Sequence, residues 1–330
     1  MENKIRQIKD LIGKANNIAL FTHVNCDMDG VGSMLGLYEF LSQNGKNVEM
    51  LVDSEVPERY GFLKNFEKIN QLEKDFLEKE EQEIDFKKFD LLISLDTSTL
   101  GRLGKFGEIF KDFPETLNID HHISNTNYAG FDYIKQYSSC GEVVYEVLKG
   151  FDEEINETTA TCLFSAISSD TNRFSNSNIT STTHKYAGEL IDIGADHNLV
   201  NIFLHKNKTQ PQLKMIAYMT QNLKYHKGVS YLFVRLKDLK KLKVKSSEIS
   251  IFQHLVCNIS NTKINMIIKE RGNDEYRISL RSVDGIDVNN VASKFGGGGH
   301  KNAAGCHLFG KFKKELKKLL DECVKEIEKQ

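Results

Sequence analysis

Short apolar runs alternate with helical patterns through the first half of the chain, and this alternation restricts the possible fold more than any other feature. A continuous apolar run bounded by polar residues is typical of a buried strand, and spacing of three to four residues is typical of a helix. Alternation of the two predicts an α/β fold, a mostly parallel sheet with helices on both faces. We expect strands at residues 17–21, 47–53, 90–96 and 115–120, and helices at 2–14, 30–44, 140–150 and 157–169.

The second half of the chain has a different pattern. Three helical segments follow one another between residues 181 and 226, and the alternating runs 264–271 and 276–282 flank "GNDE", which predicts a β-hairpin. We expect a first domain at 1–185, a helical linker at 186–215 and a smaller C-terminal α/β domain at 216–330 that ends in an amphipathic helix. The charged run at 73–89 is expected to form a solvated helix and loop.

Acidic residues and histidines stand where several of these elements end. In a parallel sheet the carboxyl ends of the strands share one edge, where ligands bind, so these side chains are expected to converge. A lone carboxylate at such a place usually caps a helix or turn, and for residues 22–33 alone both interpretations stay open. Clustered carboxylates repel one another unless a cation lies among them, so the full set predicts a metal site. The set comprises His23, Asp27, Asp29, Asp96, Asp120, His121, His122 and Asp170.

The ligand types narrow the choice of metal. Carboxylates and imidazoles without thiolates suit manganese, with iron, cobalt or zinc as alternatives, better than a structural zinc or calcium site. So many ligands exceed the needs of one ion. Two ions about 3.5 to 4 Å apart that share a carboxylate would use them and would suit phosphoryl chemistry.

Composition sets limits on partners and location. The net charge of −2 gives no overall basic surplus for long nucleic acids, so a nucleic-acid substrate is expected to be short or to be held locally. Six scattered cysteines without C-x-x-C spacing favour reduced thiols. The N-terminus lacks the apolar core of a signal peptide and no run of about 18 apolar residues occurs, so we expect a cytoplasmic protein with no membrane association.

Five ordered motifs resemble the DHH phosphoesterase superfamily and its DHH-associated C-terminal domain. They are "HVNCDMDGVGS", "DTSTLGRLG", "IDHHISN", "SSDTNRF" and "FGGGGHKNAAG", and the resemblance extends from about residue 15 to 310. It implies a two-domain fold with two divalent ions, usually Mn²⁺. Carried over by position, it implies that one ion is held by His23, Asp27 and Asp96, and the other by Asp29, Asp96, His121 and Asp170.

Within the superfamily, the sequence is most similar to the compact NrnA type. Longer RecJ-type exonucleases and membrane-type cyclic-dinucleotide phosphodiesterases carry segments that are not seen here, and family II pyrophosphatases lack the "GGGGH" motif. The resemblance implies a homodimeric, manganese-dependent phosphodiesterase, exonuclease and 3′(2′),5′-bisphosphate nucleotidase acting on short RNA or DNA and on pAp. Hydrolysis of pApA or cyclic di-AMP stays open, and an inorganic pyrophosphatase or a non-catalytic nucleotide-binding module is a more distant alternative.

Further roles follow from the resemblance and from chemistry. Family members often have proline where this chain has Cys26, and we interpret Cys26 as an inert replacement. His122 follows a predicted ligand and is expected to contact the scissile phosphate or protonate the leaving oxygen, although it could simply pack behind the site. The glycine run is expected to precede a second helix whose N-terminus binds phosphate. The predicted catalytic residues are Asp96 and His122, and the predicted substrate-binding residues are Arg102, Arg281, Ser282, Gly297, Gly298, Gly299 and His300.

Overall fold

The computed structural model describes residues 2–71, 84–206, 208–244, 249, 259–272, 274–283 and 285–329. The chain forms two compact units, Met1–Asn207 and Lys208–Gln330, each with its own hydrophobic cores. The predicted linker at 186–215 is divided between the two units. Most of the charged run at 73–89 lies outside the described residues.

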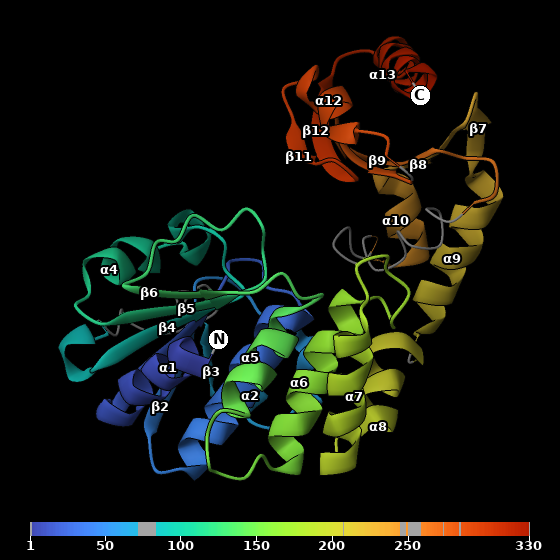
Figure 1. The fold of residues 1–330 in the computed structure, drawn as a ribbon. Helices are drawn as coiled ribbons and strands as arrows, with labels where there is room; N and C mark the ends of the chain where they lie inside the picture. Colours follow the sequence, from blue (N-terminus) through green and yellow to red (C-terminus); the bar gives the residue numbers. More distant parts are fainter. Residues whose placement is uncertain are drawn as a thin grey trace. The chain divides into compact units, whose positions relative to one another are not determined.

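The first unit is built on a six-stranded parallel sheet in the order β3-β2-β1-β4-β5-β6 (Figure 1). The four predicted strands are confirmed, and β3 and β6 were not predicted because both are short and partly polar. The strand order changes direction between β1 and β4, where open α/β sheets bind ligands at the carboxyl ends. The strands are β1 (Asn17–Thr22), β2 (Asn47–Val52), β3 (Ile69–Gln71), β4 (Leu91–Leu95), β5 (Thr116–Asp120) and β6 (Phe131–Ile134).

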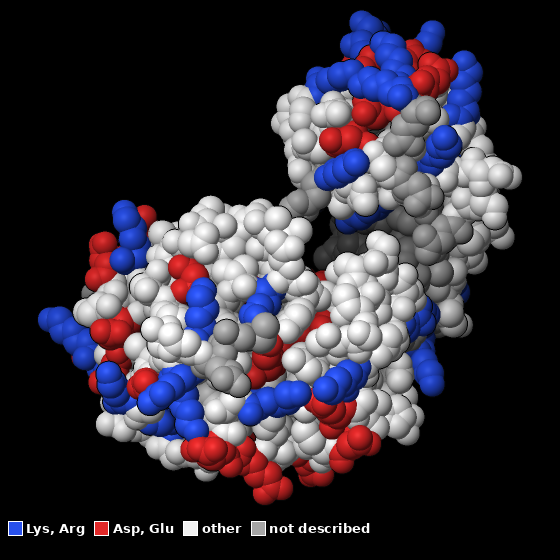
Figure 2. All heavy atoms as spheres, in the orientation of Figure 1, with Lys and Arg blue, Asp and Glu red and all other residues white. Residues whose placement is uncertain are grey.

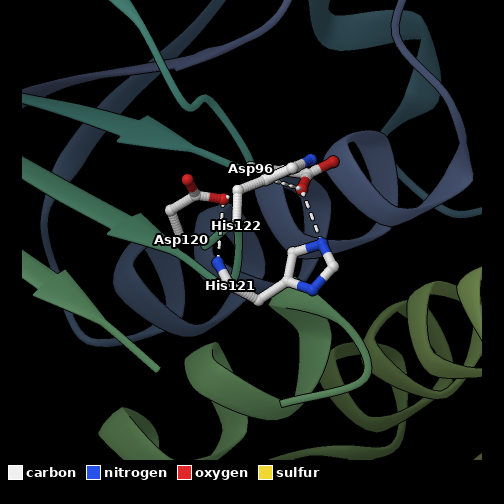
Figure 3. A group of neighbouring side chains, drawn as sticks. All are labelled: Asp96, Asp120, His121 and His122. Atoms are coloured by element: carbon white, nitrogen blue, oxygen red, sulfur yellow. Dashed lines mark hydrogen bonds and ion pairs between the residues drawn. The ribbon is translucent and has the colours of Figure 1, made fainter. Parts of the chain in front are cut away.

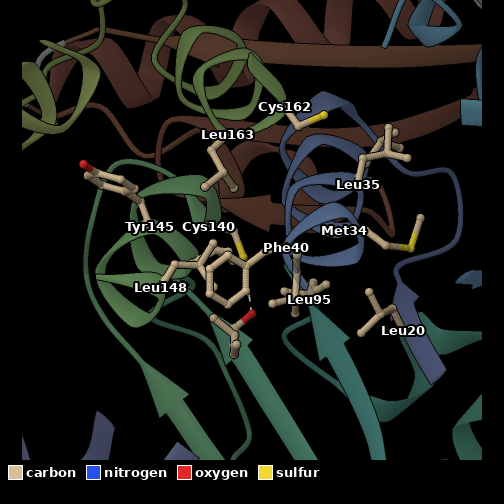
Figure 4. Close-up of a cluster of buried hydrophobic side chains, with 14 of the residues drawn as sticks. Leu20, Met34, Leu35, Phe40, Leu95, Cys140, Tyr145, Leu148, Cys162 and Leu163 are labelled. Atoms are coloured by element: carbon tan, nitrogen blue, oxygen red, sulfur yellow. Dashed lines mark hydrogen bonds between the residues drawn. The ribbon is translucent and has the colours of Figure 1, made fainter. Parts of the chain in front are cut away.

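Side chains of β1 alternate between two cores, so helices cover both faces of the sheet. Ile18 and Leu20 join the larger core, part of which Figure 4 shows, whereas Ala19 and Phe21 join the smaller one. The helices on the larger core are α1 (Glu2–Lys14), α2 (Met28–Gln43), α5 (Cys140–Leu148), α6 (Glu157–Asp170), α7 (Ser181–Ile193) and α8 (His197–Asn201). Helix α4 (Phe106–Asp112) packs on the smaller core. These helices confirm the predicted α/β architecture.

Helices α2 and α6 approach closely because glycines of α2 face α6. A Cβ atom on Gly32 would lie 2.7 Å from the carbonyl oxygen of Cys162, and one on Gly36 would lie 2.8 Å from the side chain of Leu163. Real Cβ atoms do not approach backbone oxygens so closely. Glycine at position 32 therefore allows the short distance between α2, whose first turn contains Asp29, and α6, which ends on Asp170.

The second unit is a mixed six-stranded sheet in the order β11-β12-β10-β9-β8-β7, with helices on both faces (Figure 1). The predicted hairpin of β9 and β10 is confirmed. The strands are β7 (Lys224–His226), β8 (Val229–Val234), β9 (Ile264–Gly272), β10 (Glu275–Ser282), β11 (Gly298–His300) and β12 (Ala303–Phe309). The helices are α9 (Gln210–Asn222) and α10 (Leu236–Leu242) on one face, and α12 (Val288–Ser293) and α13 (Phe312–Glu328) on the other.

The glycine run corrects one sequence-based expectation. Residues 298–300 form strand β11, which pairs with β12, so the predicted helix after the glycines is wrong. Gly296 has a φ of +68° after the end of α12, and a Cβ on Gly297 would lie 2.1 Å from the carbonyl oxygen of Gly305. The glycines therefore allow a turn and a close approach of two strands rather than a helix N-terminus.

The two units have opposite charge balances. Residues 1–207 contain 34 Asp and Glu against 20 Lys and Arg, whereas residues 208–330 contain 24 Lys and Arg against 12 Asp and Glu. Figure 2 shows one face of this distribution. The overall charge of −2 thus conceals an acidic unit and a basic one. No helix that the structure describes has both the length and the apolar character needed to cross a membrane.

The helix contact generates the first prediction. Gly32→Ala should lower the unfolding free energy by about 1–3 kcal/mol, because the added methyl group forces α2 and α6 apart. Gly188→Ala on α7 is the matched control, because a Cβ there meets no atom within 4 Å, and it should raise stability by about 0.5–1 kcal/mol. Thermal unfolding followed by circular dichroism measures both. A Gly32→Ala protein at least as stable as Gly188→Ala would contradict the packing argument.

Candidate metal centre

Residues after β1 and β4 form a first group of metal-binding side chains. One ligand atom from each of His23, Asp27 and Asp96 can be chosen so that all lie within 4.8 Å of one another. His23 Nε2 lies 3.5 Å from Asp96 Oδ2 and 4.0 Å from Asp27 Oδ1. Asp27 also caps helix α2, accepting hydrogen bonds from the amides of Asp29 and Gly30. The helix-cap interpretation is therefore correct for Asp27 but does not exclude a metal at the same carboxylate.

A second group gathers around His121 at the end of β5. His121 Nε2 lies 3.4 Å from Asp96 Oδ1, 3.6 Å from Asp29 Oδ2 and 3.8 Å from Asp170 Oδ2. Asp96 thus contacts His23 with its Oδ2 atom and His121 with its Oδ1 atom, and so belongs to both groups. The structure brings together all six residues that the sequence nominated as ligands.

The local structure aims the imidazoles at the acids. The Nδ1 atom of His23 lies 2.9 Å from the carbonyl oxygen of Val24, and Nδ1 of His121 lies 3.2 Å from that of Tyr137. A carbonyl oxygen only accepts, so each Nδ1 carries the proton and each Nε2 is directed to the cluster. Neighbours of this kind fix the tautomer that a metal-binding histidine needs.

Asp29 is held by the N-terminus of helix α5. Its two carboxylate oxygens accept hydrogen bonds from the backbone amides of Cys140, at 2.7 Å, and Gly141, at 3.0 Å. The positive end of a helix dipole stabilises such a carboxylate. The contact fixes α2 to α5 across the sheet edge and orients Asp29 toward His121.

Asp96 occupies a conformation that few residues tolerate. Its φ is +55°, in the left-handed region where Asp and Asn are enriched. A Cβ on Gly30 would lie 2.2 Å from Thr22 Oγ1 and 3.4 Å from Asp96 Oδ2, so glycine lets α2 pass close to both strands. Among the described residues, Oδ1 of Asp96 is buried and finds no hydrogen-bond partner.

The charges of the cluster are unbalanced without a cation. Burial, together with the charges of Asp96 and Asp170, raises the pKa of Asp29 well above its ordinary value. Burial also raises the pKa of Asp170 to about 7. Although burial opposes protonation of His121, its close contact with Asp96 and the charges of three acids raise its pKa to about 11. Protons therefore occupy the cluster near neutral pH, in the place that a cation would take.

Three observations fit a pair of divalent ions at this site. The donors are carboxylates and correctly oriented imidazoles, a buried carboxylate oxygen makes no hydrogen bond among the described residues, and the acids require positive charge. Metal binding would displace the protons, so the affinity is expected to rise with pH. These features support the predicted two-metal centre and leave the identity of the ion open.

His122 is outside the two groups described above, although with Asp96, Asp120 and His121 it forms a third set whose ligand atoms lie within 4.8 Å of one another. Its Nδ1 is 2.7 Å from Asp120 Oδ1 and 3.6 Å from Asp96 Oδ1 (Figure 3). The His122 side chain is 28% exposed, whereas the Asp120 side chain is fully buried. The ring of His122 is thus partly open to solvent beside the centre, and its contact with the substrate stays a prediction.

The predicted substrate-binding residues lie in both units. Arg102 belongs to the first unit, where its carbonyl oxygen accepts a hydrogen bond from Val24 and its charge acts on His23. In the second unit, Arg281 of β10 is opposite Ala303 of β12, which is opposite His300 of β11. Ser282 follows on β10, and Gly297, Gly298 and Gly299 form the turn into β11 and the start of that strand.

Sequence reasoning missed two features of the site. The sequence places Asp120 in the predicted acidic set but gives it no role distinct from the ligands, and it gives no signal for Asn125, which donates a hydrogen bond to Asp120 at 2.6 Å. No spacing rule marks such an asparagine. Cys26 matches the expectation of an inert residue, because it is buried and burial raises the pKa of its thiol to about 12.

Comparison with known proteins identifies both units. The family model for the DHH family, N-terminal domain, matches residues 17–167, and the DHHA1 domain model matches residues 198–326. The chain is 30% identical to a Mycoplasma genitalium protein named bifunctional oligoribonuclease and PAP phosphatase NrnA, over 99% of this chain and 98% of the relative. A Bacillus subtilis protein of the same name is 27% identical over 89% of this chain and 90% of the relative.

A solved structure shares the fold. An exopolyphosphatase-related protein from Bacteroides fragilis superposes with a TM-score of 0.89, at 22% sequence identity, over 99% of this chain and 96% of that protein. This likeness concerns the fold alone.

The shared position of Asp96 generates the second prediction. Asp96→Asn keeps a side chain that tolerates positive φ but removes the charge, so Mn²⁺ affinity should fall by more than the roughly 10- to 100-fold typical of outer-shell changes. The protein should stay folded because repulsion within the cluster falls. Calorimetric titration with Mn²⁺ measures the affinity, and exposed Asp192→Asn on α7 is the control. Wild-type affinity and stoichiometry in Asp96→Asn would contradict the assignment.

Proposed function

This chain belongs to the DHH phosphoesterase superfamily and is a phosphoesterase, and from that premise we propose that it hydrolyses short RNA oligonucleotides and pAp to mononucleotides. The observation that carries the proposal is the pair of ligand groups that meet at Asp96, at the point where the strand order changes direction. The substrate class is supported by the full-length relatives, which are named for oligoribonuclease and PAP phosphatase activity.

The residues of the first unit would serve two roles in phosphoryl transfer, metal binding and contact with the substrate. A pair of divalent ions, when bound, supplies Lewis-acid stabilisation of the phosphoryl group and activation of water. His23, Asp27, Asp29, Asp96, His121 and Asp170 would hold the pair. His122 contributes an imidazole whose Nε2 is available to the substrate, because its Nδ1 is hydrogen-bonded to Asp120. It would donate to the scissile phosphate or to the leaving oxygen.

The second unit would bind the part of the substrate away from the scissile bond. Its surplus of Lys and Arg over Asp and Glu provides the local positive field that the net charge of the whole chain does not reveal. Arg281 and His300 lie one strand apart on either side of Ala303, so they would act at one end of the sheet. Since no helix follows the glycine run, phosphate binding there would depend on these residues and on strand amides.

Three finer expectations stay predictions: manganese as the ion, a homodimer as the assembly and the cytoplasm as the location.

A substrate panel tests the proposed function. Metal-stripped protein supplied with Mn²⁺ should hydrolyse pAp and RNA of two to a few nucleotides, and chelation should abolish turnover. The panel also contains pApA, cyclic di-AMP and pyrophosphate, with turnover measured as released nucleotide or phosphate. Hydrolysis of pyrophosphate alone, or of no substrate, would overturn the proposal.

His122→Ala generates the third prediction. Loss of a general acid or phosphate contact should lower kcat by about 10²- to 10⁴-fold. Bound metal, measured by elemental analysis, should be unchanged because His122 is in neither ligand group. His197→Ala, which removes an exposed histidine of α8, is the control. Loss of metal from His122→Ala would make His122 a ligand and refute the assigned role.

Arg281→Ala generates the fourth prediction. Loss of one charge-assisted hydrogen bond costs about 1.5–3 kcal/mol, so kcat/KM for pAp and dinucleotides should fall roughly ten- to a hundredfold. Bis-p-nitrophenyl phosphate, which is too short to reach a remote contact, should be much less affected. Arg277→Ala, on the same strand but outside the proposed set, is the control. Equal losses on both substrates would show that Arg281 supports the fold instead.

A further inference from the structure

Asp120 is the most completely hydrogen-bonded acid near the metal centre. Its Oδ1 accepts from the backbone amide of His121 at 2.8 Å and from Nδ1 of His122 at 2.7 Å, and its Oδ2 accepts from Nδ2 of Asn125 at 2.6 Å. The residue is fully buried. A buried carboxylate that satisfies three donors is a fixed part of the structure, and each donor is fixed with it.

This environment separates Asp120 from the residues proposed as metal ligands. Its carboxylate lies close enough to Asp96, His121 and His122 to share a metal with them on distance alone. Hydrogen bonds already use both lone pairs of Oδ1 and one of the two lone pairs of Oδ2, however, so three of the four acceptor sites of the carboxylate are occupied. Oδ1 of Asp96, in contrast, is buried and makes no hydrogen bond among the described residues. The bonding pattern assigns Asp120 to His122 rather than to a metal.

The contact determines which ring nitrogen of His122 faces the substrate. An ionised carboxylate only accepts, so Nδ1 of His122 carries a proton and Nε2 is the atom left for other partners. Because the ring is 28% exposed and its Nδ1 edge is bound to a buried group, the Nε2 edge is the one open to a ligand.

Asn125 connects Asp120 to the loop that follows strand β4. Its Nδ2 also lies 3.2 Å from the carbonyl oxygen of Thr97, the residue after Asp96, and its Oδ1 accepts from the amide of Asn127 at 2.8 Å. The amide of Thr126 donates to the carbonyl oxygen of Ser98. The loop that carries His122 is thereby fixed to the loop that carries Asp96.

We propose that Asp120, clamped by Asn125, is a positioning residue that fixes the ring orientation and the Nδ1–H tautomer of His122. The inference deepens the proposed function, on which it rests only for the catalytic use of His122. The substitution Asp120→Asn cannot satisfy all three donors, because an amide nitrogen at the position of Oδ1 would face the His121 amide and one at the position of Oδ2 would face Nδ2 of Asn125. The acceptor of the Nδ1 proton is then lost or loses its clamp, so the ring no longer presents Nε2 to the substrate in a fixed direction.

Nuclear magnetic resonance tests the tautomer directly. In the full-length, metal-free protein labelled with ¹⁵N-histidine, the His122 ring nitrogens, assigned by comparison with His122→Ala, should show a protonated Nδ1 in the wild type. Asp120→Asn should lower the fraction of His122 rings that are protonated at Nδ1 and broaden their signals. Asp132→Asn is the matched control, since this acid of β6 accepts a hydrogen bond from Asn118 and makes none with His122. It should leave the His122 spectrum unchanged.

Kinetics test the consequence with Mn²⁺ and a dinucleotide as the probes. Asp120→Asn should lower kcat by about 100-fold or more with KM and bound metal unchanged, as expected for a group that acts through a general acid. Asn125→Ala is the second variant, in case Asp120→Asn does not fold. It should keep the Nδ1–H tautomer, broaden the His122 ring signals and lower kcat about tenfold.

The outcomes separate this inference from the proposed function. A wild-type His122 spectrum together with wild-type kcat in the folded variants overturns the positioning role, and so does loss of metal from Asp120→Asn, which would make Asp120 a ligand. If the wild-type protein hydrolyses no member of the substrate panel, the proposed function fails. The tautomer measurement then still decides whether Asp120 fixes His122.

Discussion

Mutual repulsion among buried carboxylates is the constraint on which the rest of the first unit depends. Asp29, Asp96 and Asp170 surround one imidazole nitrogen of His121 at the carboxyl edge of the parallel sheet. In a medium of low polarity such acids cannot all stay ionised without nearby positive charge. The elevated pKa values of Asp29, Asp170 and His121 express this conflict, and a pair of divalent ions resolves it.

The fold supplies the geometry that this chemistry needs. The strand order changes direction between β1 and β4, so the chain leaves the sheet on opposite sides there and opens space for a ligand. Positive φ at Asp96, the missing side chain of Gly30 and the N-terminus of α5 at Asp29 then bring three carboxylates from separate elements to distances of 3.4 to 3.8 Å from Nε2 of His121. Stability and function depend on the same close contacts, because α2 and α6 carry acids of the centre and also form the core of the unit.

Much of this architecture could be predicted from the sequence, because the signals are local. Apolar runs that end on Asp96 and Asp120 identify strands and their carboxyl ends, and the candidate acids and histidines follow from elements that share one edge. The choice of six ligands among them follows from the family resemblance. The remaining features depend on contacts between distant segments. β3 and β6 are strands because neighbouring strands pair with them, and the glycine run forms a strand because β12 lies against it, which local propensity does not reveal. The clamp of Asp120 by Asn125 depends on the loop conformation, and the opposite charges of the two units disappear in the sum over the whole chain.

The most direct test of the central claim is anomalous X-ray diffraction from crystals of the protein grown with Mn²⁺. If Asp96 is shared by two ions, data collected at the manganese edge will show two peaks about 3.5 to 4 Å apart, one on each side of its carboxylate. One peak should lie beside His23 and the other beside His121. A single peak at full occupancy, or manganese bound away from Asp96, would contradict the two-metal account.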